Sequence, residues 1–276
     1  MTYQQPGIWG GSLQSMIIGS SNDAEAVKAQ YSTSSGLNTR IAFHDKYSTN
    51  KTGYGNWILS NYEIPEGAKV LELGCGTAGM WAGHDDLIAE CGLLLLTDLS
   101  EGMLSEARAN VGERDNVEYA LADIQDLPFE DGSFDVVIAN AMLYHVPDIE
   151  KGIREVRRVL KSNGTFYCAT YGERNFSDVL AEWFELDGES FTPNHNFTLQ
   201  NGEHMLKAAF TDVKTGLYED SLRITDIDDL VGYLQTLVSL KAIADLPFDR
   251  IREILMRHSC NGTIELPKEY GMFICR

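Results

Sequence analysis

The chain has 276 residues, and 43% of them are hydrophobic, so it is long enough to bury a core larger than that of a minimal domain. Its formal net charge is −19, from 22 basic and 41 acidic side chains, which argues against nucleic acid or an anionic membrane surface as a partner. The acidic excess favours solubility, and attraction of a cationic acceptor such as an amine or a basic peptide is the alternative.

The five cysteines lack the C-x-x-C spacing of metal sites and are odd in number, which indicates buried free thiols in a reducing compartment. The sequence shows neither a secretory signal pattern nor an apolar stretch long enough to span a bilayer. We therefore expect a cytoplasmic protein without a bound metal. The sequence carries no signal for an oligomeric state.

The N-terminal part is expected to form a helical extension. Arg40, Phe43, His44 and Tyr47 recur at the spacing of one helix face. A face that mixes arginine, histidine and aromatic rings can line a polar cleft, and a surface helix with docked aromatic rings is the alternative. Short helices are expected over residues 23–30, 37–48 and 56–62.

A strand followed by a glycine turn begins the central part. Residues 70–79 read VLELGCGTAG, and such a turn is expected to open a helix and to let a ligand lie against bare main chain. Gly74, Gly76 and Gly79 also fit the dinucleotide pattern G-x-G-x-x-G, so a nicotinamide-dependent oxidoreductase is an alternative. However, Glu72 would repel a diphosphate at that helix N-terminus. The same carboxylate suits S-adenosylmethionine, which carries an ammonium and a sulfonium.

At this turn the chain resembles the class I S-adenosylmethionine-dependent methyltransferases, whose first motif is usually written E/D-x-G-x-G-x-G. The third glycine is replaced here by Ala78, which also leaves room for a ligand. The resemblance implies that Glu72, Gly74, Cys75 and Gly76 contact the cofactor.

The next strand ends in an acidic residue. Residues 93–98 form a continuous apolar run typical of a buried parallel strand and end in Asp98, which can accept hydrogen bonds from ribose hydroxyls. Ser100 is expected to cap the following helix. The pattern D-x-S-x-x-M-L matches the second motif of the family, which adds Leu99 and Met103 to the implied cofactor contacts.

Two more strands complete the resemblance, which extends from about residue 70 to residue 171. An alternating strand ends at Asp123. By resemblance, Asp123 receives the adenine amino group and Ile124 packs on the ring. A turn and another buried strand then lead to Asn140, a further implied cofactor contact.

Methyl transfer is an in-line displacement that depends mainly on alignment and on exclusion of water. A general base is needed only for an acceptor that carries a proton on its nucleophilic atom. His145 is the candidate base, and a structural role is the alternative. Tyr144 and Tyr171, with Arg40 and His44, are the candidates for binding the acceptor.

Residues 43–50 are similar to the entry segment of quinone-biosynthesis type methyltransferases, in which the tyrosine closes over the cofactor. Tyr47 is that tyrosine here. An aromatic ring beside a sulfonium gains roughly 0.5–2 kcal/mol of cation–π attraction.

The expected fold is α/β: a Rossmann-like, seven-stranded, mainly parallel methyltransferase sheet whose last strand is antiparallel, with a helical N-terminal extension and a helical lid insertion. Its expected parts are an extension or lid over 1–59, a cofactor-binding core over 60–221, an insertion covering the active site over 222–260 and the last strand region over 261–276. Later helices are expected over residues 152–161, 176–186, 201–210, 226–244 and 248–258, and later strands over 213–218 and 271–275.

The sequence thus predicts an enzyme that moves the methyl group of S-adenosylmethionine to an oxygen or nitrogen of a small molecule or short peptide, giving S-adenosylhomocysteine. Two alternatives stay open. One is the nicotinamide-dependent oxidoreductase, and the other is a non-catalytic module that binds S-adenosylmethionine as a sensor.

Overall fold

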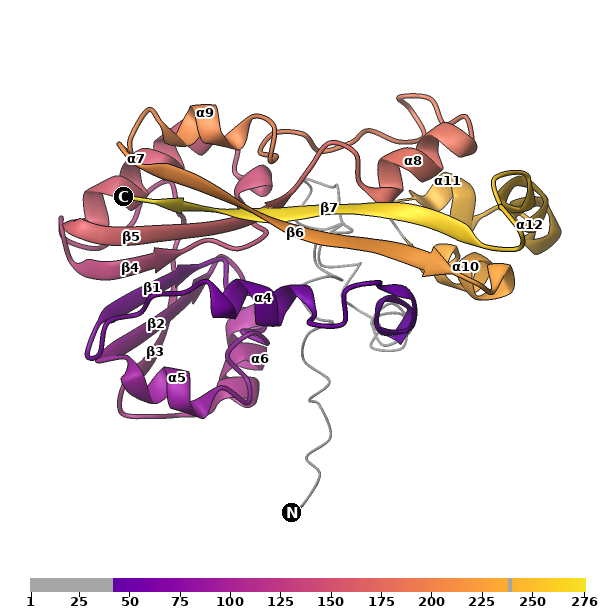
Figure 1. Ribbon diagram of the computed structural model, residues 1–276. Helices are drawn as coiled ribbons and strands as arrows, with labels where there is room; N and C mark the ends of the chain where they lie inside the picture. Colours follow the sequence, from indigo (N-terminus) through magenta and orange to yellow (C-terminus); the bar gives the residue numbers. More distant parts are fainter. Residues whose placement is uncertain (1–41, 238–239) are drawn as a thin grey trace, which may run out of the picture.

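The computed structural model describes residues 42–237 and 240–276, and a single seven-stranded sheet lies at its centre (Figure 1). The strands are β1 (Lys69–Leu73), β2 (Leu93–Asp98), β3 (Val117–Leu121), β4 (Phe134–Ile138), β5 (Leu160–Tyr171), β6 (Val213–Ile224) and β7 (Ile264–Cys275). Their order in the sheet is β3-β2-β1-β4-β5-β7-β6. Neighbours from β3 to β5 are parallel, whereas β7 runs antiparallel to β5 and β6. The expected Rossmann-like sheet with an antiparallel last strand is confirmed.

Helices flank this sheet. Among them, α6 packs on β2 and β3, and α7 packs on β5. The helices are α4 (Tyr54–Ser60), α5 (Asp85–Glu90), α6 (Glu101–Val111), the 3-10 turn η2 (Leu143–His145), α7 (Ile149–Val159), α8 (Phe176–Trp183), α9 (Gly202–Leu206), α10 (Ile227–Leu234), α11 (Lys241–Ala244) and α12 (Phe248–Arg257).

Two of the helices predicted for the N-terminal region overlap residues that the structure describes. Residues 42–47 are helical, within the expected helix over 37–48, and α4 corresponds to the helix expected over 56–62. The remainder of the first of these and the expected helix over 23–30 lie outside the described residues. The helix expected over 226–244 is interrupted, because α10 ends at Leu234 and α11 begins only at Lys241.

The inner strands are buried on both faces, as their continuous apolar runs predict. Four of the six residues of β2 and four of the five residues of β1 are buried. All five cysteines are free; Cys260 is exposed and the other four are buried. No helix in the described ranges is long and apolar enough to cross a membrane.

β6 and β7 are much longer than expected. Their antiparallel pairing continues to Ile224 opposite Ile264, and Figure 1 shows both strands running past the ends of the other strands toward α10 and α12. The outer halves are stabilised by a second hydrophobic cluster, to which Leu222 and Leu266 belong. A proline at position 267 disfavours a strand in a sequence-based assignment, which is why the β7 prediction stopped short.

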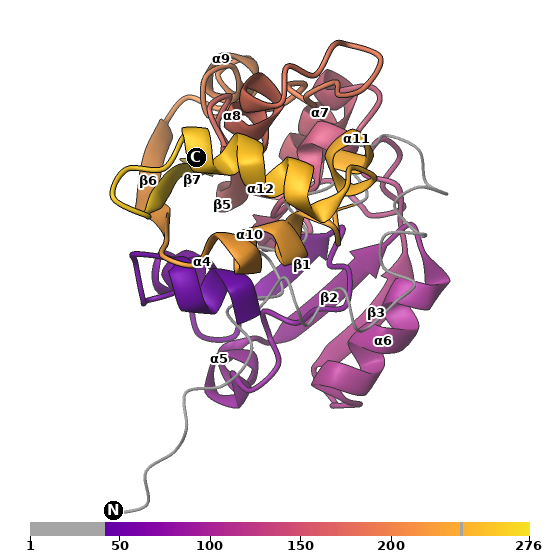
Figure 2. The same ribbon diagram turned by 90° about the vertical axis from the view of Figure 1, so that its right-hand side faces the viewer.

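This second cluster defines a cap, made of α8, α10, α11, α12, the outer halves of β6 and β7, and residues 42–47. Its buried side chains form a core separate from the hydrophobic core of the main sheet. Seen along the hairpin, the cap helices lie in front of the sheet (Figure 2). The helices expected between residues 222 and 260 therefore exist, and they sit at the far end of a long hairpin.

Candidate functional site

The carboxyl ends of the parallel strands bring the predicted cofactor residues to one edge of the sheet. Leu73 pairs with Thr97, so β1 and β2 end side by side, and Asp98 pairs with Leu121 at the end of β3. This edge of an open α/β sheet is where ligands bind.

The glycine turn after β1 needs its glycines. Gly74 and Gly76 have φ of 63° and 56°, in the left-handed region. A Cβ on Gly74 would lie 3.0 Å from Cβ of Met142, which follows β4. The turn is tied to β2 by the backbone N–H of Cys75, which donates to the carbonyl of Thr97 at 2.8 Å. The chain after β4 thus approaches the turn where it has no side chain, and contact of a ligand with this bare main chain stays a prediction.

The turn does not open a helix, and this corrects the sequence prediction. The chain continues as tight turns, in which Ala78 N donates to Cys75 O, Trp81 N to Ala78 O and His84 N to Trp81 O, at 2.9–3.0 Å. The next helix, α5, begins only at Asp85. The electropositive helix end that a diphosphate needs is therefore displaced from the glycines. This observation weighs against the dinucleotide alternative.

Glu72 is a buried carboxylate, only 5% exposed, at the floor of this turn. Its Oε2 accepts a hydrogen bond from Nε1 of Trp81 at 2.5 Å. Burial raises the pKa of Glu72 to about 7; the Trp81 hydrogen bond opposes this shift and the nearby charge of Asp98 adds to it. Sequence reasoning missed Trp81, because the pairing depends on how the turns fold back.

Asp98 closes the glycine turn from the side of β2. Its Oδ2 accepts from Gly76 N and its Oδ1 from Ser100 N, both at 2.9 Å. Burial raises the pKa of Asp98, and these backbone hydrogen bonds oppose the shift. Ser100 caps α6 by accepting from Met103 N, as predicted. The Asp98 carboxylate is thus fixed by backbone N–H groups, and it retains acceptor capacity for a ligand hydroxyl.

The predicted adenine side lies next to it. Oδ1 of Asp123 accepts from the backbone N of Gln125 at 2.8 Å, which orients this carboxylate. Ile124 is buried and packs near Gly152. Leu99 is 73% exposed, an apolar side chain that a flat ring could cover.

Asn140 is buried and fixes the end of β4. Its Nδ2 donates to the hydroxyl of Tyr62 at 2.5 Å, and its Oδ1 accepts from the backbone N of Ala169 at 3.2 Å. The next residue, Ala141, has a left-handed φ of 52°, a strained conformation that is common around functional sites. These bonds give Asn140 a positioning role, and its cofactor contact stays a prediction.

The candidate base and two of the predicted acceptor-binding residues come together. The ring of Tyr144 lies 4.4 Å from that of His145 and 4.8 Å from that of Tyr171, centroid to centroid. The hydroxyl of Tyr171 donates to the carbonyl of Asn194 at 2.5 Å, and burial raises the pKa of Tyr171. Asn194 in turn donates from Nδ2 to the carbonyl of Tyr144 at 3.0 Å. The loop after α8 is therefore part of this side.

The two predicted residues of the N-terminal helix lie elsewhere than expected. His44 is buried in the cap, where its Nε2 lies 3.0 Å from the hydroxyl of Tyr233. Tyr47 is buried there too and donates its hydroxyl to Oδ2 of Asp229 at 2.6 Å. This packing gives both a structural role and does not support a ligand contact. Arg40 lies outside the described residues.

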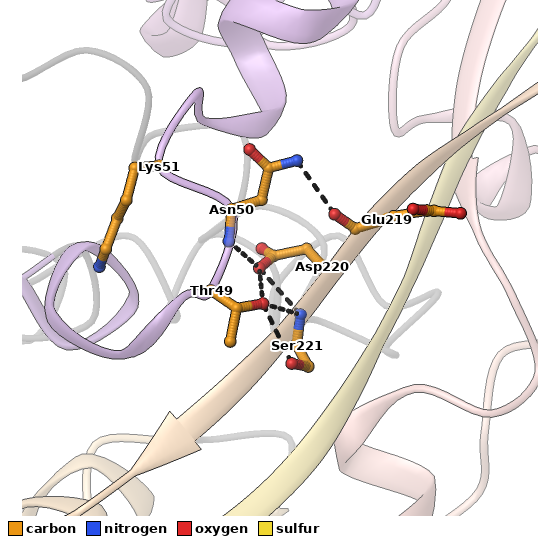
Figure 3. A pocket seen from close by; sticks show the side chains of 6 residues that line it. All are labelled: Thr49, Asn50, Lys51, Glu219, Asp220 and Ser221. Atoms are coloured by element: carbon orange, nitrogen blue, oxygen red, sulfur yellow. Dashed lines mark hydrogen bonds between the residues drawn. The ribbon is translucent and has the colours of Figure 1, made fainter.

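A surface hollow at the root of the β6–β7 hairpin contains none of the predicted site residues. Figure 3 shows that its side chains come from the segment after residue 47 and from β6, and that several of them bond to one another. Asp220 Oδ1, for example, accepts from Asn50 N at 2.9 Å. The lining residues are Thr49, Asn50, Lys51, Glu219, Asp220 and Ser221. The described residues also contain no group of three or more side chains placed to hold a metal ion.

Comparison with known proteins agrees with this geometry. Residues 71–168 match the family model described as a methyltransferase domain. This chain therefore contains a methyltransferase domain. The matched part of the methyltransferase domain runs from β1 to β5 and contains the glycine turn and the three strand-end carboxylates.

The methyltransferase domain has relatives in quinone biosynthesis. The chain is 38% identical over 119 residues to the ubiquinone/menaquinone biosynthesis C-methyltransferase UbiE of Cronobacter sakazakii. This match covers 42% of this chain and 47% of that protein. It is 32% identical over 111 residues to the demethylmenaquinone methyltransferase of Staphylococcus epidermidis, covering 40% and 46%. The match thus spans about half the length of these relatives.

A solved structure shares the fold of most of this chain. The YcgJ protein of Bacillus subtilis superposes with a TM-score of 0.52 at 20% identity, over 80% of this chain and 96% of that one.

Proposed function

We propose that this protein transfers the methyl group of S-adenosylmethionine to a small-molecule acceptor bound between the carboxyl edge of the sheet and the cap. The observation that carries the proposal is the buried carboxylate of Glu72 at the glycine turn. Burial raises the pKa of this carboxyl group to about 7. A cation placed beside it would stabilise the ionised form, and this attraction would favour binding of a cationic ligand.

The donor set at this edge fits the chemical groups of S-adenosylmethionine. Glu72 would face the ammonium of the amino-acid tail, Asp98 the ribose hydroxyls and Asp123 the adenine amino group, because ionised carboxylates only accept hydrogen bonds. Leu99 would cover the adenine. Three carboxylates suit a cationic nucleoside and would repel a diphosphate, which supports the methyl donor over a nicotinamide dinucleotide.

S-adenosylmethionine supplies an already activated methyl group, so the protein's task is to align the acceptor and exclude water. Tyr144, His145 and Tyr171 lie together beside the ends of β4 and β5, and we assign them to the acceptor side. In this proposal, Asn140 acts through the loop that follows it, by holding the end of β4 in place.

An oxygen or nitrogen of a small molecule or short peptide remains our proposed acceptor atom. A second candidate is a ring carbon of a reduced quinone, favoured by the identity to proteins named as quinone-biosynthesis methyltransferases. The family model, which matches residues 71–168, covers neither the cap nor the loop after α8, where acceptor recognition would lie. The net charge of −19 supports a neutral or cationic acceptor over a nucleic acid.

Titration calorimetry tests the proposal directly. The wild type should bind S-adenosylmethionine and S-adenosylhomocysteine and give no heat with NADH. Asp98→Ala should weaken S-adenosylmethionine binding by more than tenfold, because it removes the fixed ribose acceptor. Binding of NADH and not of S-adenosylmethionine would refute the proposal. Binding without S-adenosylhomocysteine production from any hydroquinone, phenol, amine or peptide acceptor would favour a sensor.

A further inference from the structure

Tyr62 packs on the face of the sheet that carries the Glu72 side chain. Glu72 pairs with Ile138, and Ile138 pairs with Tyr167, so these three residues form one row across β1, β4 and β5. Because side chains alternate between the two faces along each strand, paired residues of neighbouring strands point to the same face. The ring of Tyr62 lies 4.9 Å from the ring of Tyr167, centroid to centroid. Tyr62 and Glu72 therefore share one face.

The backbone around Tyr62 is fixed to its neighbours. Tyr62 lies two residues after the end of α4, and its backbone N donates to the carbonyl of Leu59 at 3.1 Å. The backbone N of Glu63 donates to the hydroxyl of Tyr167 at 2.9 Å, which ties this segment to β5. The Tyr62 ring is thus positioned by contacts within the protein.

The Tyr62 hydroxyl lies at the end of β4, where it accepts a hydrogen bond from Asn140. Oδ1 of Asn140 accepts from the backbone N of Ala169 at 3.2 Å, which sets the orientation of the amide. Nδ2 of Asn140 then donates to Oη of Tyr62 at 2.5 Å. This bond uses a lone pair of the hydroxyl and leaves its proton for another acceptor. No residue within 42–237 and 240–276 accepts that proton in a hydrogen bond.

The charge of Glu72 acts on this hydroxyl. Burial raises the pKa of Tyr62 well above its ordinary value, the negative charge of Glu72 adds to the shift, and the hydrogen bond from Asn140 opposes it. Tyr62 therefore keeps its proton at neutral pH. It is a neutral hydrogen-bond donor on the same face as a buried carboxylate.

The amino-acid tail of S-adenosylmethionine needs such a donor, because it carries a carboxylate on the same carbon as its ammonium. If Glu72 faces the ammonium, the ligand carboxylate lies close by, and ionised Glu72 and Asp98 repel it and cannot donate to it. We propose that the Tyr62 hydroxyl donates a hydrogen bond to the carboxylate of this tail and so makes the site select ligands that carry it. This inference rests on the proposed function and adds a specificity-determining residue to it.

Calorimetric titration with two ligands tests this role. Decarboxylated S-adenosylmethionine keeps the sulfonium and the ammonium but lacks the carboxylate. Tyr62→Phe should weaken binding of S-adenosylmethionine by about tenfold or more, because it removes a hydrogen bond to a charged group. It should change binding of the decarboxylated ligand by no more than about twofold, because no such bond exists there. Disturbance of Asn140 alone would weaken binding of both ligands alike, so the difference between them isolates the carboxylate contact.

Tyr167→Phe is the matched control. It removes a hydroxyl from the same pair of rings, and that hydroxyl bonds to the backbone N of Glu63. Both affinities should stay within about twofold of wild type, because no ligand contact is lost.

Equal losses for the two ligands in Tyr62→Phe, or no loss for either, would overturn the proposal. If Tyr62→Phe does not fold, the wild type decides, since it should bind S-adenosylmethionine more tightly than the decarboxylated ligand. An equal or reversed order of affinity in the wild type would contradict the proposal. A wild type that binds neither ligand would instead refute the proposed function.

Discussion

Lys268 and Asp220 form an ion pair with buried side chains where the β6–β7 hairpin leaves the sheet. Nζ of Lys268 lies 2.5 Å from Oδ2 of Asp220, and both side chains are 0% exposed. We predict that Lys268→Met lowers the free energy of unfolding by about 3–5 kcal/mol, because it leaves the Asp220 carboxylate buried without a counter-charge.

The surroundings of the pair place the loss in this range. Oδ1 of Asp220 accepts from the backbone N of Asn50 at 2.9 Å and of Ser221 at 2.8 Å. Nζ of Lys268 also donates to Oγ of Ser48 at 2.7 Å. These bonds hold the carboxylate in its buried position when the ammonium is removed.

Urea unfolding followed by circular dichroism measures the effect. The double variant Asp220→Asn with Lys268→Met keeps an oxygen for the backbone N–H groups and removes both charges, so it should recover most of the loss. Lys241→Met is the control: it breaks an exposed pair with Asp245 and should cost less than about 1 kcal/mol. A Lys268→Met loss no larger than that of Lys241→Met would refute the reasoning.

Two further substitutions test the carboxyl edge and its support. Tyr54→Phe should cost about 1–2 kcal/mol in urea unfolding, because the single proton of the buried hydroxyl is shared between the carbonyls of Gly271 at 2.6 Å and Thr170 at 3.1 Å. An unchanged midpoint would contradict this. Gly74→Ala should weaken S-adenosylmethionine binding more than tenfold in calorimetry, since its φ is 63° and the new Cβ would press on Met142. If Gly74→Ala bound S-adenosylmethionine with wild-type affinity, the turn would accommodate a Cβ at this position and the prediction would be wrong.

The features that the sequence predicted well are those that depend on neighbours along the chain. Residues 93–98 form β2 as expected, and Ser100 caps α6, because an apolar run and a cap are local patterns. The carboxylates at the strand ends follow from parallel pairing alone. By contrast, the Glu72–Trp81 bond depends on a series of turns that no periodicity describes.

The cap shows what periodicity cannot supply. Helical spacing correctly placed His44 and Tyr47 within a helix, but it could not say what would cover that helix. Tyr233 and Asp229, their partners, lie more than 180 residues further along the chain.

The central claim is that Glu72 faces the positive charge of the methyl donor. In the protein without ligand, burial raises the pKa of Glu72 to about 7. A bound cation favours the ionised carboxylate, so binding below that pH releases a proton from Glu72. The affinity of wild type for S-adenosylmethionine should therefore rise up to about fivefold from pH 6 to pH 7, a range in which the α-amino group of the ligand stays protonated.

Calorimetric titration of wild type and Glu72→Gln with S-adenosylmethionine at pH 6 and pH 7 measures this rise. Glutamine still accepts the Trp81 hydrogen bond but cannot ionise. The account predicts weaker binding by Glu72→Gln and no rise between the two pH values. Equal affinity of the two proteins at both pH values would contradict it.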